Sequence, residues 1–345
     1  MISGLESSLI TPCAGSMMEP ARWRKRRAGS AMLAASQTGN VCVAATSAPT
    51  SRVGVWSPVN TGVLAMKTLV LCNQKGGVGK SAVATLLAHH LAHHGRRVLA
   101  IDLDHQGNFS KPLRLSGRAD VAAFASDALM TGLAPALPDR PFVLVPGDRA
   151  LLGLERQPAL HTPFARQFRS FLSAVDAAFD VCVIDTNPNP DIRVIAALAS
   201  ADFVLSPIQL NQEAMDGVSG LLNHERVGLR KIKAVLNPKL SLIGLLPTLV
   251  EPTPFQKANF LQVVQQYHPL MIRIGEGPGA FAWMPRRSCI AEAQAEGLVL
   301  WDMKKTAARD AWREIEPSLK RIADIDTAVA PASPSQEVNH AAATG

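Results

Sequence analysis

The chain has 345 residues, of which 47% are hydrophobic and 18% are charged, a globular composition that excludes disorder along the whole chain. No run of about 18 apolar residues occurs, which excludes a membrane-spanning protein. The net charge of +7 includes +4 in the first 65 residues, so any nucleic-acid binding must come from local basic patches. The five cysteines show no CxxC or CxxxC spacing, so we expect neither a disulfide framework nor a zinc site, as suits a reducing cytosol.

The first 65 residues are rich in Ser, Ala, Gly and Thr and carry one basic burst, ARWRKRR, from Ala21 to Arg27. We expect residues 1–65 to be a disordered basic extension, because they lack the periodic apolar pattern of a packed core. An arginine-rich, acid-poor leader also has the composition of an organelle transit peptide, whereas the late position of the charges disfavours a secretory signal. The folded pattern begins directly after Met66, which makes Met66 an alternative start.

From Met66 onward, short apolar runs alternate with helix-length amphipathic segments. This alternation predicts an α/β fold, a doubly wound and mostly parallel sheet with helices on both faces, in one domain over residues 66–325. The expected strands are 67–72, 97–102, 142–145, 181–185, 203–207 and 242–250. The expected helices are 80–94, 119–130, 164–179, 192–199, 213–227, 254–267, 288–296 and one from Met303, which Pro317 should kink or restart. Residues 326–345 should form a disordered tail.

Residues 73–81 have the sequence NQKGGVGKS and join an apolar strand to a helix. Glycines at this place let backbone N–H groups curl round phosphate oxygens, and the helix start adds a positive dipole end. The lysine of GKS would reach the β- and γ-phosphates, and the serine hydroxyl would bind Mg²⁺. We therefore expect Lys80 to be catalytic and Ser81 to be a magnesium ligand. The residues expected to hold the nucleotide phosphates are Gly76, Gly77, Val78, Gly79, Lys80, Ser81 and Ala82.

The loop departs from the strict G-x-x-x-x-G-K-[ST] form, because Gln74 stands at the first glycine and Lys75 precedes the paired glycines. With this KGGxGK[ST] pattern the chain resembles the ParA/MinD family of P-loop ATPases, over about residues 66–324. The resemblance implies ATP and Mg²⁺ as cofactors, an ATP-dependent homodimer, and a catalytic role for Lys75 at the partner's phosphates. A cation delivered to the partner would offset transition-state charge as an arginine finger does, and would couple hydrolysis to dimerisation.

Two further apolar strands end in aspartate, at the sheet edge where doubly wound folds bind ligands. Residues 98–108, VLAIDLDHQGN, resemble the family's DxDPQGN segment, which implies that Asp102 belongs to the magnesium shell and that Asp104 orients the attacking water. Asp185 resembles the Walker B aspartate, which holds Mg²⁺ through water.

Three residues near these motifs depart from the family pattern. His105 and Asn187 stand where prolines are usual, and Ala82 replaces a hydroxyl residue. None of the three removes a metal or phosphate ligand. We therefore expect nucleotide binding and an ATPase, converting ATP and water to ADP and phosphate, that is slow without a partner.

Late segments of the chain continue the resemblance, which implies that Asn237 and Pro285 border the adenine. No Asn-Lys-x-Asp motif is present, so ATP is preferred over GTP.

The helix after the phosphate loop carries four histidines, at positions that form i,i+4 pairs: His89, His90, His93 and His94. Such pairs could chelate a metal on one face of a helix, but no second cluster supplies further ligands. We expect packing and solvation instead, with His90 and His94 inward and His89 and His93 outward.

Two groups of cations are candidates for contact with DNA phosphates: Arg230 and Lys231 in one, and Lys305, Arg309 and Arg313 in the other. Family members bind DNA non-specifically as ATP dimers through such surface cations, which track phosphates without reading bases. The alternative for each residue is a solvated helix face, since acids such as Asp310 and Glu314 are interspersed.

Within the family, missing features favour the DNA-partition branch. A basic amphipathic C-terminal helix, paired interface cysteines and a tyrosine cluster are absent from the sequence, and these mark the membrane-bound, iron–sulfur and tyrosine-kinase branches. The partners implied are a second copy, non-specific DNA and a centromere-binding protein of the ParB type, with no membrane, in the cytoplasm on the nucleoid. Two alternatives stay open: a scaffold that positions a protein complex, and a nucleotide-dependent regulator of replication or transcription.

Overall fold

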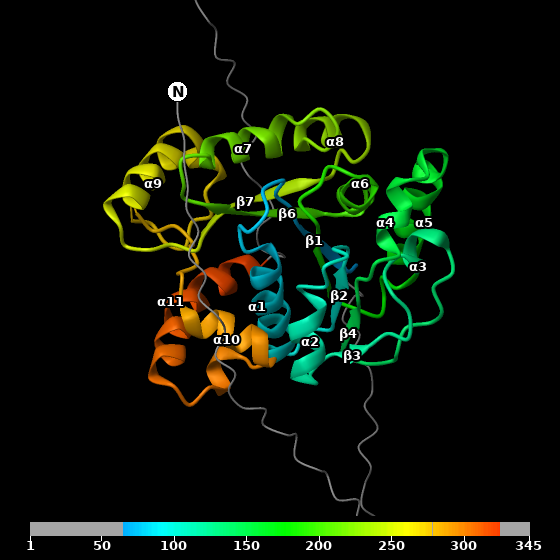
Figure 1. Ribbon diagram of the computed structural model, residues 1–345, viewed down its shortest axis with the longest axis horizontal. Helices are drawn as coiled ribbons and strands as arrows, with labels where there is room; N and C mark the ends of the chain where they lie inside the picture. The colour runs from blue at the N-terminus through cyan, green and yellow to red at the C-terminus, as the bar shows by residue number, and fades with distance from the viewer. Residues whose placement is uncertain (1–64, 278, 325–345) are drawn as a thin grey trace, which may run out of the picture. The chain divides into compact units, whose positions relative to one another are not determined.

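The computed structural model describes residues 65–277 and 279–324, so the predictions for the N-terminal extension and for the tail of residues 326–345 lie outside the described residues, apart from Ala65. Seven parallel strands form one sheet in the order β3-β4-β2-β5-β1-β6-β7 (Figure 1). The strands are β1 (Lys67–Leu71), β2 (Val98–Asp102), β3 (Asp120–Val121), β4 (Phe142–Val145), β5 (Val181–Asp185), β6 (Phe203–Gln209) and β7 (Ser241–Thr248). The predicted α/β fold is confirmed.

The central strands are buried on both faces, which explains their nearly unbroken apolar sequences. Successive side chains alternate between two cores, so Val70 and Ile101 face one core while Leu69 and Ala100 face the other. The three cysteines among the described residues, Cys72, Cys182 and Cys289, are buried without a disulfide.

Helices cover both faces of the sheet. Helices α5 (His161–Ala174), α6 (Ile192–Ser200), α7 (Ala214–Asn223) and α8 (Leu229–Val235) pack on one core, while α1 (Lys80–His93), α2 (Ser110–Ser116), α10 (Ser288–Glu296) and α11 (Thr306–Ala323) pack on the other (Figure 1). The remaining helices are α3 (Ala128–Thr131), α4 (Leu151–Glu155), α9 (Pro254–Tyr267) and the short 3₁₀ helices η1 (Pro158–Leu160), η2 (His268–Leu270) and η3 (Leu300–Asp302). No helix in the described part of the chain combines the length and apolarity that crossing a membrane requires.

Two helix predictions are wrong in detail. Residues 119–130 do not form one helix, because Ala122 and Ser126 donate backbone bonds to Leu144 and Pro146 and so tie the segment to the sheet edge as β3, followed by the short α3. The predicted helix 213–227 ends at Asn223, and α8 begins after a tight turn. A Cβ on Gly228 would lie 2.5 Å from the His224 oxygen, so the turn requires glycine.

Pro317 neither breaks nor restarts α11, which runs through it. Ala308, Ile315 and Leu319 are fully buried against the core, and this packing holds the helix on both sides of the proline. Tertiary packing therefore outweighs the lost backbone hydrogen bond.

The histidines of α1 are structural. His89 and His90 are buried, and burial lowers the pKa of each to about 4, so both are neutral at pH 7. His89 packs on Phe142 and His90 on Trp312, whereas His93 and His94 are exposed. The predicted orientation is thus wrong for His89 and His94. The described residues contain no cluster of three or more His, Cys, Asp or Glu side chains that could hold a metal.

Candidate nucleotide site

The loop between β1 and α1 follows from its glycines. Gly77 and Gly79 adopt φ of 75° and 83°, a left-handed conformation that disfavours side chains. A Cβ built on Gly76 or Gly77 would meet no atom within 4 Å, so the loop faces open space rather than packed protein. The result is a turn whose backbone lines a cavity at the start of α1.

Two polar side chains that sequence reasoning missed fix this loop to the sheet. The Asn73 amide donates to the Pro207 oxygen (2.8 Å), and its Oδ1 accepts from the Lys75 N–H (2.8 Å). The Thr248 hydroxyl, at the end of β7, donates to the Val78 oxygen at 2.6 Å. Bonds from β6 and β7 therefore hold the loop in place before any ligand binds, which lowers the entropy cost of binding.

Lys80 lies at the base of the loop and is almost fully buried. Its Nζ donates to the backbone oxygens of Asn73 (3.0 Å) and Lys75 (3.2 Å). Burial lowers the pKa of Lys80, and the nearby Asp185 carboxylate opposes that shift. The ammonium is therefore placed at the phosphate-binding turn with partners that a phosphate could replace.

Asp185 ends β5 directly beside Asp102, its register partner on β2. Both carboxylate oxygens of Asp185 are buried and have no hydrogen-bond partner of normal geometry among the described residues. Burial and the charge of Asp102 raise the pKa of Asp185 well above its usual value, against the smaller effects of the Ser81 hydroxyl and Lys80. A buried carboxylate with unused oxygens next to a serine hydroxyl is a donor set that suits a divalent cation.

The two aspartates after β2 differ in surroundings. Asp102 is fully buried and accepts bonds from Asp104 N–H (2.9 Å), Ser110 N–H (2.8 Å) and the Ser110 hydroxyl (2.6 Å), while burial raises its pKa to about 6. Asp104 lines the cavity instead, and its Oδ1 accepts from the Gln106 N–H at 3.0 Å. Asp104 is thus the carboxylate of this loop that a molecule in the cavity would meet.

Gly147 packs closely against the loop that carries Asp104. A Cβ there would lie 2.4 Å from the Asp104 backbone oxygen, and the Gly147 N–H donates to the Ser110 hydroxyl at 3.1 Å. No sequence motif marks Gly147 or Ser110, because their role depends on a contact between the start of α2 and the loop after β4, which are 37 residues apart along the chain.

Lys75 does not line the cavity of its own chain. Its Nζ forms an ion pair with Glu213, just before α7, and the two side chains are 26% and 69% exposed. Hydrogen bonding with Lys75 lowers the pKa of Glu213. Such an exposed pair is weak, so Lys75 can exchange this partner for another anion at little cost.

The cavity measures about 550 Å³ and lies at the carboxyl edge of the sheet. Its lining consists of Gly76, Gly77, Gly79, Lys80, Ser81, Ala82, Asp104, Gln106, Asn108, Lys111, Pro112, Pro188, Leu249, Gln294 and Ala295. The open glycine turn, the buried Lys80 ammonium and the unpaired Asp185 oxygens fit a nucleoside triphosphate with Mg²⁺. Lys80 and the loop N–H groups would hold the phosphates, and Ser81 and Asp185 would hold the metal.

The structure contradicts the role predicted for Asn237. Its amide donates to the Leu198 oxygen (3.0 Å) and the Ala201 oxygen (2.7 Å), before β7 begins. This is the amino edge of a parallel sheet, opposite the phosphate loop, so the prediction that Asn237 borders the adenine is wrong.

Pro285 lies at the correct edge, where it bridges Val250 beyond the end of β7, but it does not line the cavity. Leu249 and Gln294 do line it, and sequence reasoning missed both. Leu249 has φ of 53°, a strained value for this residue type, and the Gln294 Nε2 is buried without a partner among the described residues. Both features are typical of ligand sites.

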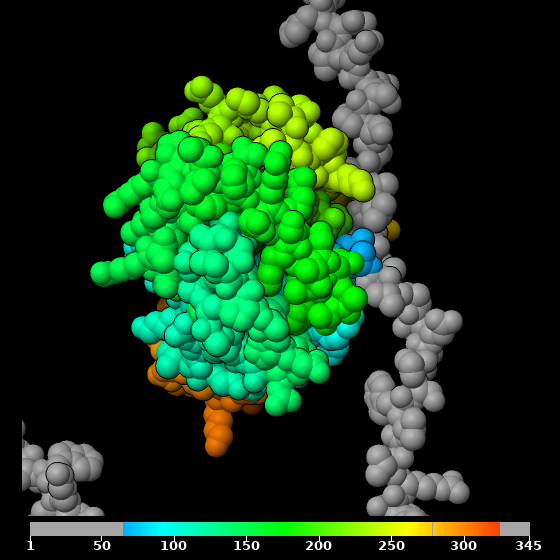
Figure 2. Space-filling model, turned by 90° about the vertical axis from the view of Figure 1, so that its right-hand side faces the viewer, coloured from blue at the N-terminus to red at the C-terminus, as the bar shows by residue number. Residues whose placement is uncertain are grey.

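The candidate DNA-binding cations form two separate groups. Arg230 and Lys231 lie on α8, and the group around α11 lies on the opposite face of the sheet; Figure 2 shows the yellow-green residues of α8 at the top and the orange residues preceding α11 at the bottom. Lys305 pairs with Glu292 and Arg313 with Asp310 (3.0 Å), while Arg309 contacts the Thr306 hydroxyl.

On α8, Arg230 donates to the neutral amide of Asn223 (2.8 Å), and no described acid pairs with Lys231. The positive charge on α8 is therefore less neutralised than the charge near α11.

Comparisons with known proteins agree with this geometry. The profile of a family described as AAA domain matches residues 66–242, which include the phosphate loop and both aspartate-ended strands. Protein IncC of Escherichia coli is 33% identical over 284 residues, 79% of this chain and 73% of IncC. The chromosome-partitioning ATPase Soj of Thermus thermophilus is 34% identical over 186 residues, 54% of this chain and 70% of Soj. Cobyrinic acid a,c-diamide synthase of Mycobacterium smegmatis, solved with bound ADP and magnesium, has a TM-score of 0.54 and 27% identity, covering 67% of this chain and 91% of that one.

Proposed function

Because the chain belongs to the ParA/Soj/IncC family of partition ATPases, we propose that it segregates DNA through a cycle of ATP binding, dimerisation and hydrolysis. ATP with Mg²⁺ promotes a sandwich dimer, and the dimer binds DNA non-specifically on the nucleoid in the cytoplasm. A centromere-binding partner of the ParB type then stimulates hydrolysis, which releases the DNA.

The observation that carries this proposal is the placement of the two loop lysines. Lys80 is buried at the base of the cavity, whereas the Lys75 side chain of the same loop is 26% exposed, does not line the cavity and pairs with Glu213. A single phosphate loop thus offers one cation to its own nucleotide and one to a neighbouring molecule. This placement fits a nucleotide site that is completed by Lys75 of a second copy.

We assign the residues at the cavity different roles in hydrolysis. Lys80 and the loop N–H groups bind and orient the phosphates, and Asp104 holds the attacking water in line. Ser81 and Asp185 would hold Mg²⁺, which would supply charge neutralisation at the phosphates. Asp102 fixes the backbone of the loop that carries Asp104, through its bonds to Asp104 and Ser110.

The charge distribution supports α8 as the first candidate for DNA binding. We expect the double variant Arg230→Ala/Lys231→Ala to weaken binding of the ATP-bound protein to random duplex DNA, and to lower the slope of log affinity against log salt by about two, since each phosphate contact contributes about one. The matched variant Arg309→Ala/Arg313→Ala should lose less, because the Asp310 carboxylate beside Arg313 lowers the net positive charge of that surface. Fluorescence anisotropy with labelled DNA over a salt series measures both slopes.

Basal ATP hydrolysis provides the folding control for both variants, because neither pair of residues lines the cavity. If the α11 pair changed the salt slope and the α8 pair did not, the assignment of the DNA surface to α8 would fail.

A further inference from the structure

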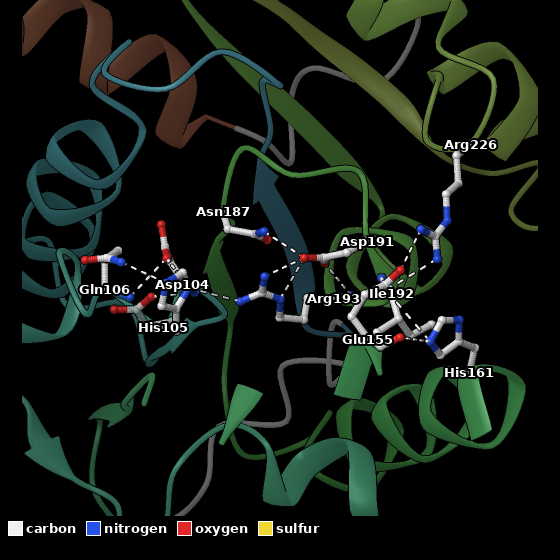
Figure 3. A network of polar contacts seen from close by, with 11 residues as sticks. Asp104, His105, Gln106, Glu155, His161, Asn187, Asp191, Ile192, Arg193 and Arg226 are labelled. Carbon is white, nitrogen blue, oxygen red and sulfur yellow. Dashed lines mark hydrogen bonds and ion pairs between the residues drawn. The ribbon is translucent and has the colours of Figure 1, made fainter. Parts of the chain in front are cut away.

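A chain of polar contacts joins the two loops that carry the aspartates of the site (Figure 3). One loop follows β2 and contains Asp104 and His105; the other follows β5 and runs from Asn187 to Arg193 at the start of α6. The contacts pass from Asn187 through Asp191, Arg193 and His105 to Asp104. Two members of this chain of contacts, His105 and Asn187, stand where the family pattern has prolines, whose side chains cannot form hydrogen bonds.

The middle of the bridge is rigid. Arg193 is only 2% exposed, and its Nε donates to Asp191 Oδ2 at 3.0 Å, with a further short contact from Nη2. Asp191 also caps α6, accepting from the Arg193 N–H at 3.0 Å, and accepts from the Asn187 amide at 2.9 Å. A buried ion pair with this many bonds has one orientation, because any other would leave a charge unpaired.

The start of α6 has a second support. Glu155 of α4 accepts from the Ile192 N–H at 2.8 Å and from Arg226 at 2.7 Å, as Figure 3 also shows. The loop after β5 is therefore anchored on both sides, and Arg193 presents its remaining nitrogen, Nη1, at a fixed place.

That nitrogen lies 3.4 Å from His105 Nδ1, and the same Nδ1 lies 3.3 Å from Asp104 Oδ1. One ring nitrogen either accepts from Arg193 or donates to Asp104, since it has either a lone pair or a proton. On its other side, His105 Nε2 lies 2.7 Å from the Gln106 side-chain nitrogen. The imidazole is thus held on both sides, with Asp104 and Arg193 facing the same atom.

We propose that His105 is a positioning residue for ATP hydrolysis: its Nδ1 either donates to Asp104 and holds that carboxylate in the cavity, or accepts from Arg193 and ties the loop after β2 to the loop after β5. Asp104 Oδ1 is bound by the Gln106 N–H and His105, which leaves Oδ2 for the water. The inference rests on the proposed role of Asp104 in orienting that water. His105 does not line the cavity, so it acts through Asp104 and not on the nucleotide.

Steady-state ATP hydrolysis of the full chain tests this inference with two substitutions of similar size. Asn can place an amide where Nδ1 lies, whereas Gln places its amide nearer to Nε2. We expect His105→Gln to lower kcat about tenfold, as supporting contacts typically do, with KM for ATP unchanged. His105→Asn should restore most of the lost kcat. His268→Gln, at an exposed histidine of η2, is the control for a generic histidine loss.

The link to Arg193 is tested by Arg193→Lys, which keeps the charge beside Asp191 and removes the contact with His105. We expect the kcat of the double variant with His105→Gln to match that of His105→Gln alone, because Arg193 acts on Asp104 only through His105. Independent, multiplicative losses would overturn the bridge.

Asp104→Asn separates failure of this inference from failure of the proposed function. If Asp104→Asn lowered kcat and His105→Gln did not, the positioning role of His105 would be overturned alone. If Asp104→Asn left kcat unchanged, the proposed role of Asp104 would fall, and the inference with it. A rise in KM with unchanged kcat in His105→Gln would also overturn it.

Discussion

Replacement of Lys80 by alanine is expected to weaken ATP binding by about a hundredfold or more, because charge-assisted hydrogen bonds to phosphate contribute about 1.5–3 kcal/mol each. Among the described residues, the Lys80 Nζ bonds to the backbone oxygens of Asn73 and Lys75, which a phosphate would replace or join. Titration of the variant with a fluorescent ATP analogue in the presence of Mg²⁺ measures the loss.

The matched control is Lys239→Ala, which removes an exposed lysine at the amino edge of the sheet. Its ATP affinity should equal that of the original chain. Thermal melting without nucleotide shows whether the Lys80 variant is folded. A folded Lys80→Ala protein that bound ATP with undiminished affinity would contradict the assignment of this cavity as the ATP-binding site.

Replacement of Lys75 by alanine should have a different result. We expect nucleotide affinity to change little, because Lys75 does not line the cavity of its own chain, while hydrolysis in the dimer falls about a thousandfold, the lower range for loss of a cation supplied in trans. Single-turnover hydrolysis at saturating ATP separates the two quantities.

Mixing variants tests whether Lys75 acts across the dimer. Lys75→Ala keeps its own Asp104, and Asp104→Asn keeps its own Lys75, so a mixed dimer contains one complete site although neither homodimer does. The mixture should hydrolyse ATP faster than either variant alone. A mixture as inactive as its components would show that Lys75 acts within its own chain or only in folding.

The central strands and the phosphate loop could be predicted because their signals are local. Strands buried on both faces have unbroken apolar sequences, as in β5. The phosphate loop needs glycine where φ is positive, and Gly77 and Gly79 are visible in the sequence at these positions. The same holds for Asp185, which ends a predicted strand and lies at the predicted sheet edge.

Other features depend on contacts between distant segments. The pattern around Asn237 does not reveal at which edge of the sheet it lies, and only its bonds to Leu198 and Ala201 do. His105 and Arg193 are 88 residues apart, so their contact has no local signature. The sequence pattern at residues 120–121 predicts part of a helix, and only the pairing of this segment with β4 shows that it is a strand.

The cycle as a whole is tested most directly by binding of the full chain to random duplex DNA, measured over a salt series with ADP, ATP and a non-hydrolysable ATP analogue. We predict binding with ATP and the analogue only, and a steep loss of affinity as salt increases, because the contacts are to phosphates. Equal binding in every nucleotide state would contradict the coupling of DNA binding to the ATP cycle. Absence of binding in all states would contradict DNA as the track and favour a protein complex in its place.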